Sequence, residues 1–308
     1  MAPRIDVHHH LVAPRFLPML RETDVVAPHL AEIMNERCAL DDMDKAGVTL
    51  AINSSTTPAV MSRELRIAYA RENNEYMARL AADHPGRFGI FASLPLPDVD
   101  ATLKEIEYAF DVLRADGVHM VTSYEDHWLG DKIFTPVFDE LNRRKAVIYT
   151  HPHGPHCCLN LLKEINIRDS VIEYGTDTTR AITNLVFGGT VARCPDIRLI
   201  FSHAGGTMPF LIERFIRMEK MPRFAPLMPQ GFVAEAHKFY YDTAQVLHAS
   251  PLTALKLLIP LPQIVFGTDY PWRGSAESLN GLVASGTFTA EELCSIDRNA
   301  APLFPRFR

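Results

Sequence analysis

The sequence is poor in cysteine, and it has neither a long apolar run nor a cluster of basic residues. Its five cysteines are an odd number without Cys-x-x-Cys spacing, which favours reduced thiols over a disulfide framework. No stretch of ~18 uncharged apolar residues is present to span a membrane, and the N-terminal residues lack the apolar core of a signal peptide. We therefore expect a cytoplasmic protein.

Acidic residues outnumber basic ones, 37 to 31, which gives a formal net charge of −6. Because no basic patch is evident, binding to nucleic acid or to a membrane surface is disfavoured, and a small molecule is the expected partner. Hydrophobic residues make up 47% of the 308 residues, which is enough to bury a large core. The lack of repeats, linkers and low-complexity segments predicts a single domain over residues 1–308.

Short apolar runs of strand length alternate with helical patterns along the chain. The runs lack strict alternation of apolar and polar residues, as expected for parallel strands covered on both faces. They occupy residues 4–8, 48–54, 88–94, 118–122, 147–150, 197–202, 239–242 and 264–268. The helical patterns occupy residues 63–83, 98–115, 136–145, 178–194, 208–220 and 251–258. This alternation predicts an α/β fold, a (β/α)8 TIM barrel. An open doubly wound sheet is the alternative, but no glycine-rich turn follows the first strand.

The first predicted strand ends in Asp-Val-His-His-His, residues 6–10. Side chains two apart on a strand point to the same face, so His8 and His10 should project together into the barrel mouth as a pair of metal ligands. A solvated histidine-rich turn or a tag remnant would also give such a run, although a tag would not continue an apolar strand. His9 should face the other way and pack behind the strand.

Three later strands end in residues of the same kind. His151 and His203 follow the fifth and sixth strands, and Asp269 follows the last. Barrel enzymes build their active sites at the C-terminal ends of the strands. Five such residues on four strands are difficult to explain as buried structural polar groups, so they indicate a metal centre. His153 follows His151 closely and is a candidate substrate contact.

Weaker signals come from the other histidines, the cysteines and one apolar segment. His119 has no partner pattern, and we expect it, like several other histidines, on the surface or in a loop. The adjacent Cys157 and Cys158 cannot easily place both sulfurs on one ion, so we expect them to be pocket or core residues. Residues 208–224 are more apolar than one buried helix face requires, which is typical of an oligomer contact.

Four strand-end motifs together resemble those of the amidohydrolase superfamily. They are His-x-His at 8–10, His-Pro at 151–152, Ser-His-Ala-Gly-Gly at 202–206 and Gly-Thr-Asp-Tyr-Pro at 267–271. Their order is most similar to the decarboxylase branch that includes aminocarboxymuconate-semialdehyde decarboxylase, and the likeness covers nearly the whole chain. The resemblance implies a homodimer, a catalytic part for His203, and one divalent ion held by His8, His10, His151 and Asp269.

Two departures narrow the activity that this resemblance implies. Two-metal members of the superfamily carry a carboxylated lysine at the end of the fourth strand, but residues 117–122 contain no lysine, so a single ion is expected. The semialdehyde decarboxylase has an active-site arginine shortly before a Met-Asp-x-x-Gly-Val segment, where this chain has Ala39. An aromatic acid is therefore favoured over an acyclic muconate. The chain is most similar in its motifs to fungal decarboxylases that convert 6-methylsalicylate to m-cresol and CO₂.

The chemistry implied is non-oxidative loss of CO₂ from an ortho-hydroxy aromatic acid. Asp269 is the candidate to protonate the ring carbon, and we expect Phe91 and Trp272 to contact the substrate and exclude water. Three imidazoles and one carboxylate suit Zn²⁺, whereas Mn²⁺ or Mg²⁺ would suit a substrate that chelates through oxygen. Two alternatives remain open: a lactonase-type metal hydrolase of the same superfamily, and a metal-stabilised binding protein without turnover.

Overall fold

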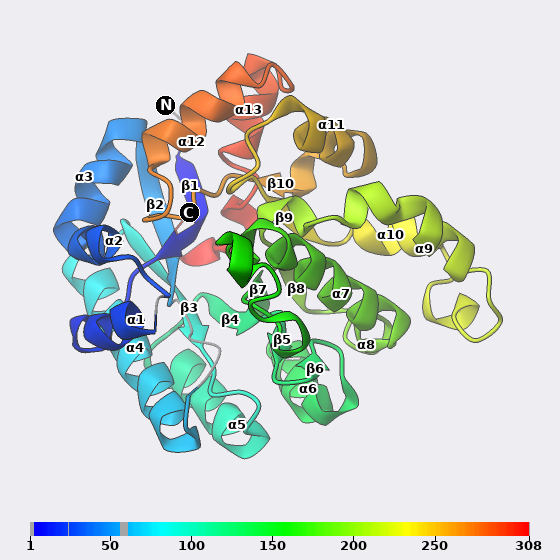
Figure 1. The fold of residues 1–308 in the computed structure, drawn as a ribbon, viewed down its shortest axis with the longest axis horizontal. Helices are drawn as coiled ribbons and strands as arrows, with labels where there is room; N and C mark the ends of the chain where they lie inside the picture. The colour runs from blue at the N-terminus through cyan, green and yellow to red at the C-terminus, as the bar shows by residue number, and fades with distance from the viewer. Residues whose placement is uncertain (1–2, 24, 56–60, 308) are drawn as a thin grey trace.

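The computed structural model describes residues 3–23, 25–55 and 61–307. Eight parallel strands form the wall of a barrel in the order in which they occur along the chain (Figure 1). They are β1 (Arg4–His10), β2 (Val48–Ser54), β3 (Phe88–Ser93), β4 (Gly117–Val121), β7 (Val147–His151), β8 (Arg198–Phe201), β9 (Tyr240–Asp242) and β10 (Ile264–Val265).

The last strand returns to the first and closes the barrel. The backbone N–H of Val7 donates to the carbonyl of Phe266 at 3.1 Å, and that of His10 donates to the carbonyl of Tyr270 at 2.9 Å. The predicted TIM barrel is therefore confirmed, and the C-terminal ends of all eight strands meet at one mouth.

Helices surround the barrel on its outer side (Figure 1). They are α1 (Leu17–Glu22), α2 (Pro28–Ile33), α3 (Glu36–Ala46), α4 (Arg63–Asp83), α5 (Val99–Glu107), α6 (Thr135–Arg143), α7 (Glu173–Phe187), α8 (Thr190–Arg193), α9 (Ile212–Met218), α10 (Phe232–Ala236), α11 (Ala249–Leu258), α12 (Ser275–Ala284) and α13 (Ala290–Ile296). Within the ranges that the structure describes, none is long and apolar enough to cross a membrane.

Local sequence explains where these helices begin and end. The Ser62 hydroxyl accepts a hydrogen bond from the Leu65 N–H at 3.2 Å, so α4 starts where the pattern predicts. The predicted helix over residues 178–194 is instead two helices, α7 and α8. Gly189 adopts a φ of +82°, a left-handed conformation that interrupts the helical path between them.

Apolar side chains fill the barrel interior near the N-terminal ends of the strands. Phe91 on β3 stacks on Tyr149 of β7 with ring centroids 5.1 Å apart, and Phe304 approaches its edge at 5.7 Å. Phe304 follows the short 3₁₀ turn Ala301–Leu303, so the segment after α13 covers the N-terminal end of the barrel. This packing leaves polar side chains to the opposite end.

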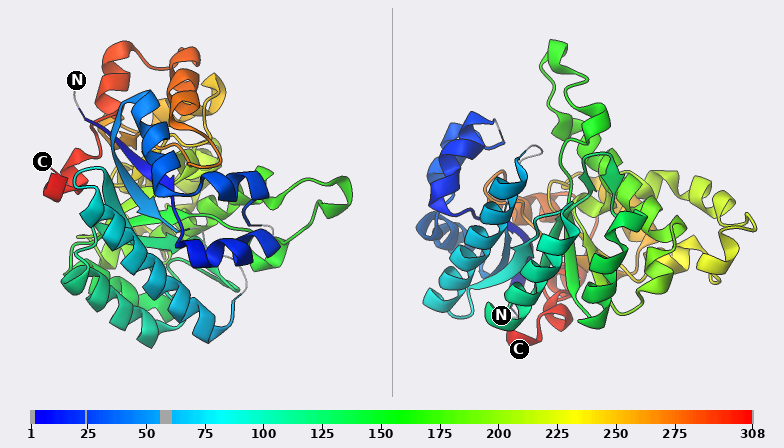
Figure 2. Two further views of the ribbon diagram at one scale, coloured as in Figure 1. Left: turned by 90° about the vertical axis from the view of Figure 1, so that its left-hand side faces the viewer. Right: turned by 90° about the horizontal axis from the view of Figure 1, so that it is seen from below.

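A long excursion between β7 and α7 departs from the barrel. We call residues 154–172 the arm; it contains three short 3₁₀ turns, η4 (His156–Cys158), η5 (Lys163–Ile165) and η6 (Asp169–Val171). Both views of Figure 2 show this green segment projecting away from the helices. A small hairpin of β5 (Ser123–Tyr124) and β6 (His127–Trp128) precedes it in the sequence.

Candidate metal centre

β1 sends alternate side chains to opposite sides, as its spacing predicts. His8 and His10 both point inward, are buried, and have ring centroids 5.0 Å apart. His9 faces the other way, where it stacks on Tyr270 at 4.5 Å and its Nδ1 donates to the Asn53 side-chain oxygen at 2.7 Å. The two inward imidazoles are therefore placed by the pleat of one strand.

His151 and Asp269 complete a cluster with the β1 pair. One ligand atom from each of the four residues lies within 4.8 Å of all the others. The Oδ1 atom of Asp269 lies 3.2 Å from Nε2 of His8 and 3.3 Å from Nε2 of His10. Asp269 has a φ of +70°, an uncommon value for a residue with a side chain, and its N–H donates to the His8 carbonyl at 2.8 Å.

The donor set fits a divalent metal ion. The Nε2 atoms of His8, His10 and His151 are buried, and none makes a hydrogen bond within the described chain. Burying a polar atom without a hydrogen bond costs free energy. Three such nitrogens directed at one point therefore indicate that they bind a ligand there. Two ligands bound at about 2.0–2.2 Å to one ion lie roughly 3.0–3.5 Å apart, which matches the Asp269–histidine separations. Burial lowers the pKa of His10, and that of His151 well below its usual range, so both imidazoles are neutral donors.

Asp242 at the end of β9 orients the site, and our sequence reasoning missed it. Its Oδ2 accepts a hydrogen bond from Nδ1 of His8 at 2.9 Å, which fixes the ring with Nε2 turned toward the cluster. Its Oδ1 accepts from the backbone N–H groups of His203 at 2.8 Å and Ala244 at 3.1 Å. Burial opposes a charge on His8, but the carboxylates of Asp242 and Asp269 raise its pKa to about 10. The sequence could have identified Asp242, because this residue lies at the end of a predicted strand as the other site residues do.

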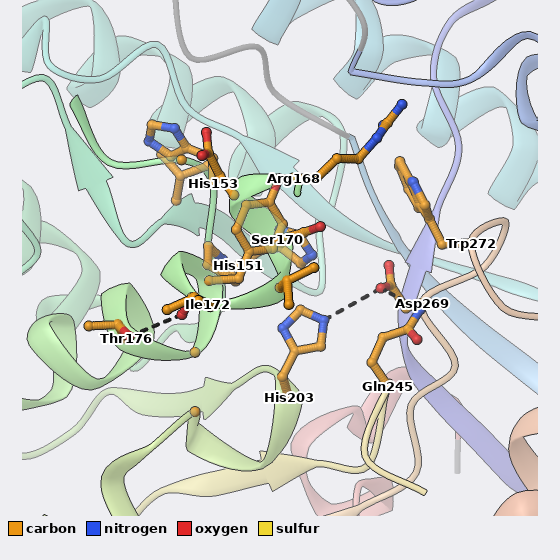
Figure 3. A pocket seen from close by; sticks show the side chains of 18 of the residues that line it. His151, His153, Arg168, Ser170, Ile172, Thr176, His203, Gln245, Asp269 and Trp272 are labelled. Atoms are coloured by element: carbon orange, nitrogen blue, oxygen red, sulfur yellow. Dashed lines mark hydrogen bonds and ion pairs between the residues drawn. The ribbon is translucent and has the colours of Figure 1, made fainter. Parts of the chain in front are cut away.

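The second oxygen of Asp269 faces two further polar side chains. Nε2 of His203 lies 3.4 Å from Asp269 Oδ2, and the Gln245 amide donates to the same oxygen at 3.0 Å (Figure 3). Burial alone would raise the pKa of Asp269. The charge of His8 and the close imidazoles of His10 and His203 instead hold this pKa well below its usual range. Asp269 is therefore a carboxylate before a substrate binds, and His203 contacts it without joining the four-residue cluster.

A cavity of about 970 Å³ adjoins the cluster. Trp272 and His153 both line it, and Figure 3 shows them on either side of the site. Trp272 packs its edge against His10 at 5.4 Å, and Nε2 of His153 donates to the Ser123 carbonyl at 2.6 Å. Phe91, predicted to contact substrate, lies instead in the barrel core away from the cavity lining, because its position on β3 points it toward Phe304.

Four more residues line the cavity that the sequence did not single out correctly. His119, expected on the surface or in a loop, is buried on β4 with its ring 6.4 Å from that of His151, and burial lowers its pKa to about 3. Gln245, Tyr174 and Arg168 also line the cavity. Arg168 comes from the arm and is the one lysine or arginine in the lining described here. Sequence alone could not place Gln245 and Arg168, because a loop and an insertion bring them in, whereas the register of β4 directs His119 inward.

Known proteins are similar to this chain in sequence and in fold. A family model described as amidohydrolase matches residues 5–295. The chain is 32% identical to the decarboxylase yanB of Aspergillus niger, over 99% of this chain and 88% of that protein. It is 34% identical to the 6-methylsalicylic acid decarboxylase of Penicillium expansum, over 87% of this chain and 85% of that protein. A crystal structure of a dihydroxybenzoic acid decarboxylase from Polaromonas sp. JS666, with bound manganese and the inhibitor 2-nitroresorcinol, has a TM-score of 0.84 at 21% identity, covering 100% of this chain and 98% of that chain.

Proposed function

Since this chain belongs to the amidohydrolase family, we propose that it is a metal-dependent, non-oxidative decarboxylase of an ortho-hydroxy aromatic acid, with 6-methylsalicylate as the first substrate to test. The observation that carries the proposal is the cluster of His8, His10, His151 and Asp269 beside a cavity large enough for a small aromatic acid. The names of the relatives support the reaction type and the substrate class.

We propose one divalent ion, held by His8, His10, His151 and Asp269. When bound there, it would act as a Lewis acid that fixes and polarises a chelating hydroxy acid. Zinc is our first candidate because three imidazoles and one carboxylate are its usual ligands. Manganese is the second, because a substrate bound through two oxygens enlarges the coordination shell with hard ligands, and a solved relative holds that ion.

Asp269 is the residue that we propose to carry the proton. Because it is a carboxylate at rest, it must first accept a proton, and the ortho phenol of the substrate is the nearest acid that the substrate itself brings. Asp269 then donates this proton to the ring carbon that bears the carboxylate. The carbon–carbon bond breaks, CO₂ leaves, and the phenolate product takes a proton from solvent on release.

His203 and Gln245 would hold Asp269 in position during this transfer. Both reach its Oδ2 atom, while Oδ1 faces the histidine cluster, so the carboxylate has a separate oxygen for each task. Trp272 would exclude water from the ring and favour departure of uncharged CO₂. His153 would add a polar side chain to the cavity wall.

Incubation with 6-methylsalicylate tests the reaction. We expect m-cresol and CO₂ in equal amounts, measured by chromatography and a carbonate sensor. Turnover of a lactone with no CO₂ from any hydroxy aromatic acid would instead identify the hydrolase alternative. Tight metal binding without turnover of either class would identify the binding protein.

Variants of His203 and Asp269 test the assignment of roles. His203→Asn should keep the metal, because His203 lies outside the four-residue cluster, but lose turnover. Asp269→Asn should lose turnover while the protein stays folded by circular dichroism. Decarboxylation retained in both variants would refute these roles.

We also propose that the enzyme is a homodimer. Phe210, Met218 and Met221 are 63%, 38% and 39% exposed, which supports an apolar contact surface in the segment 208–224. Arg214 or Arg217 would lie near that interface. Light scattering during gel filtration should give twice the 34.6 kDa chain mass, and a monomer would exclude the dimer.

A further inference from the structure

Two neighbouring thiols lie at the base of the arm. Cys157 is exposed and Cys158 is half-buried, and both belong to η4 (His156–Cys158). Their sulfur atoms are in direct contact. Neither residue lines the cavity or belongs to the apolar core, so the expectation of a pocket or core role was wrong. The reason is that η4 turns both side chains outward at the start of the excursion.

A cation stands beside this thiol pair. Nη2 of Arg180 on α7 lies 4.0 Å from Sγ of Cys158. The same guanidinium is 3.8 Å from Glu173 and 3.9 Å from Asp177, which fix its position. A nearby positive charge stabilises a thiolate over a thiol. Arg180 therefore places a positive charge beside the Cys158 sulfur.

The two thiols differ in their surroundings. Contact with Cys158 raises the pKa of Cys157. Cys158 has the guanidinium of Arg180 beside it and is therefore the better placed nucleophile. An accessible thiolate with a second thiol in reach is the arrangement found at cysteines that oxidise reversibly.

We propose that Cys157 and Cys158 are an oxidation site at which hydrogen peroxide joins the two sulfurs in a vicinal disulfide. The Cys158 thiolate attacks one peroxide oxygen and releases hydroxide, which gives a sulfenic acid at Cys158. The Cys157 thiol attacks that sulfur, the sulfur–oxygen bond breaks, and water leaves. In total, two thiols are oxidised by two electrons and one peroxide is reduced to two waters.

Ring closure between adjacent residues must change the backbone of η4. Adjacent α-carbons are about 3.8 Å apart across a trans peptide, shorter than the separation that most disulfides span. The Cys158 N–H now donates to the Pro155 carbonyl at 2.9 Å, and the residues that follow, Leu159 and Asn160, line the cavity. The disulfide therefore alters the outer cavity wall and leaves the four metal ligands in place.

The site can be tested without any substrate by treating the full-length protein with peroxide, digesting it and measuring the peptide masses. After stoichiometric hydrogen peroxide, we expect the peptide with both cysteines to lose the mass of two hydrogens, and dithiothreitol to restore it. Cys157→Ser should stop at a sulfenic acid on Cys158, which dimedone traps. Cys294→Ser is the matched control, because Cys294 is also exposed but lies on α13, and this variant should form the disulfide as the unchanged protein does.

A trivalent arsenical gives an independent measure of whether the thiols act as a pair. Phenylarsine oxide forms two arsenic–sulfur bonds and releases water, so one equivalent should protect both cysteines from alkylation in the unchanged protein. Protection should disappear in Cys157→Ser and in Cys158→Ser. Peroxide that leaves both thiols free, or converts them separately to sulfinic acids, would overturn the proposal.

The effect on the cavity rests on the proposed function and is measured separately. Oxidation should raise KM for 6-methylsalicylate at least severalfold with unchanged metal content, and dithiothreitol should reverse the change. An oxidised protein with the disulfide present and KM unchanged would overturn the link to the cavity but not the oxidation site. Loss of all turnover before oxidation would concern the proposed function alone.

Discussion

Replacing Asp242 by asparagine should weaken metal binding although Asp242 is not a ligand. Oδ1 of Asp242 accepts from two backbone N–H groups, so the amide oxygen of the variant will take that place. The amide NH₂ then replaces Oδ2 and meets Nδ1–H of His8, which puts two donors face to face. His8 can avoid this clash by moving its proton to Nε2, but that nitrogen is the one that the metal needs.

The magnitude follows from what this contact does in the native protein. Outer carboxylates that orient metal-binding histidines typically change metal affinity by about 10–100-fold when mutated. We expect a similar rise in the metal Kd for Asp242→Asn, which corresponds to about 1.4–2.7 kcal/mol. Both atoms involved are fully buried, so solvent cannot replace the lost acceptor.

Competition between the apoprotein and a chelating indicator dye measures this Kd. Asp116→Asn is the matched control, because the Asp116 side chain is only 4% exposed, accepts from the Ile90 N–H at 2.9 Å and pairs with Arg306 at 2.6 Å, away from the metal cluster. It should lose stability but bind metal normally. If Asp242→Asn bound metal as tightly as the unchanged protein, the tautomer argument would fail.

Three further outcomes are expected from the same structure. Dialysis against EDTA should abolish decarboxylation and lower the midpoint of thermal unfolding, because a ligand that binds only the folded state stabilises it. Added Zn²⁺ or Mn²⁺ should restore both. An active metal-free protein would exclude the metal centre. Arg168→Met should raise KM for the aromatic acid about tenfold with little change in kcat, since Arg168 brings positive charge to the described cavity wall; steady-state rates that match the unchanged protein would remove Arg168 from substrate binding. Phe304→Ala should lower the free energy of unfolding by about 3–5 kcal/mol in urea and leave metal stoichiometry unchanged, because the Phe304 ring fills the barrel near its N-terminal end; a loss below 1 kcal/mol would contradict that packing.

The barrel and the cluster were predictable because both depend on residues within strands. Apolar runs located all eight strands, and the rule that barrel strands end at one mouth brought His8, His151 and Asp269 together without further information. The two-residue period of β1 also placed His9 on the opposite side. These inferences needed only local pattern and topology.

Other features depended on packing that no local pattern records. Phe91 is an aromatic residue of the kind that often lines a pocket, but its register on β3 directs it into the core near the N-terminal end of the barrel. His119 reads as an isolated histidine, yet β4 places it inside the barrel beside His151. Arg168 reaches the cavity because it belongs to the arm, and long insertions carry no periodic signal of their path.

The four-residue cluster joins the two ends of the barrel wall. His8 lies on the first strand and Asp269 follows the last, and the described contact between these strands is short because β10 contains two residues. A divalent ion bound by both residues would link the first strand to the last across that junction. Bringing together residues so distant in sequence costs conformational entropy, which the bonds of the ion to both would offset. Metal uptake should therefore stabilise the closed barrel, and withdrawal of the ion should weaken this junction before the rest of the wall.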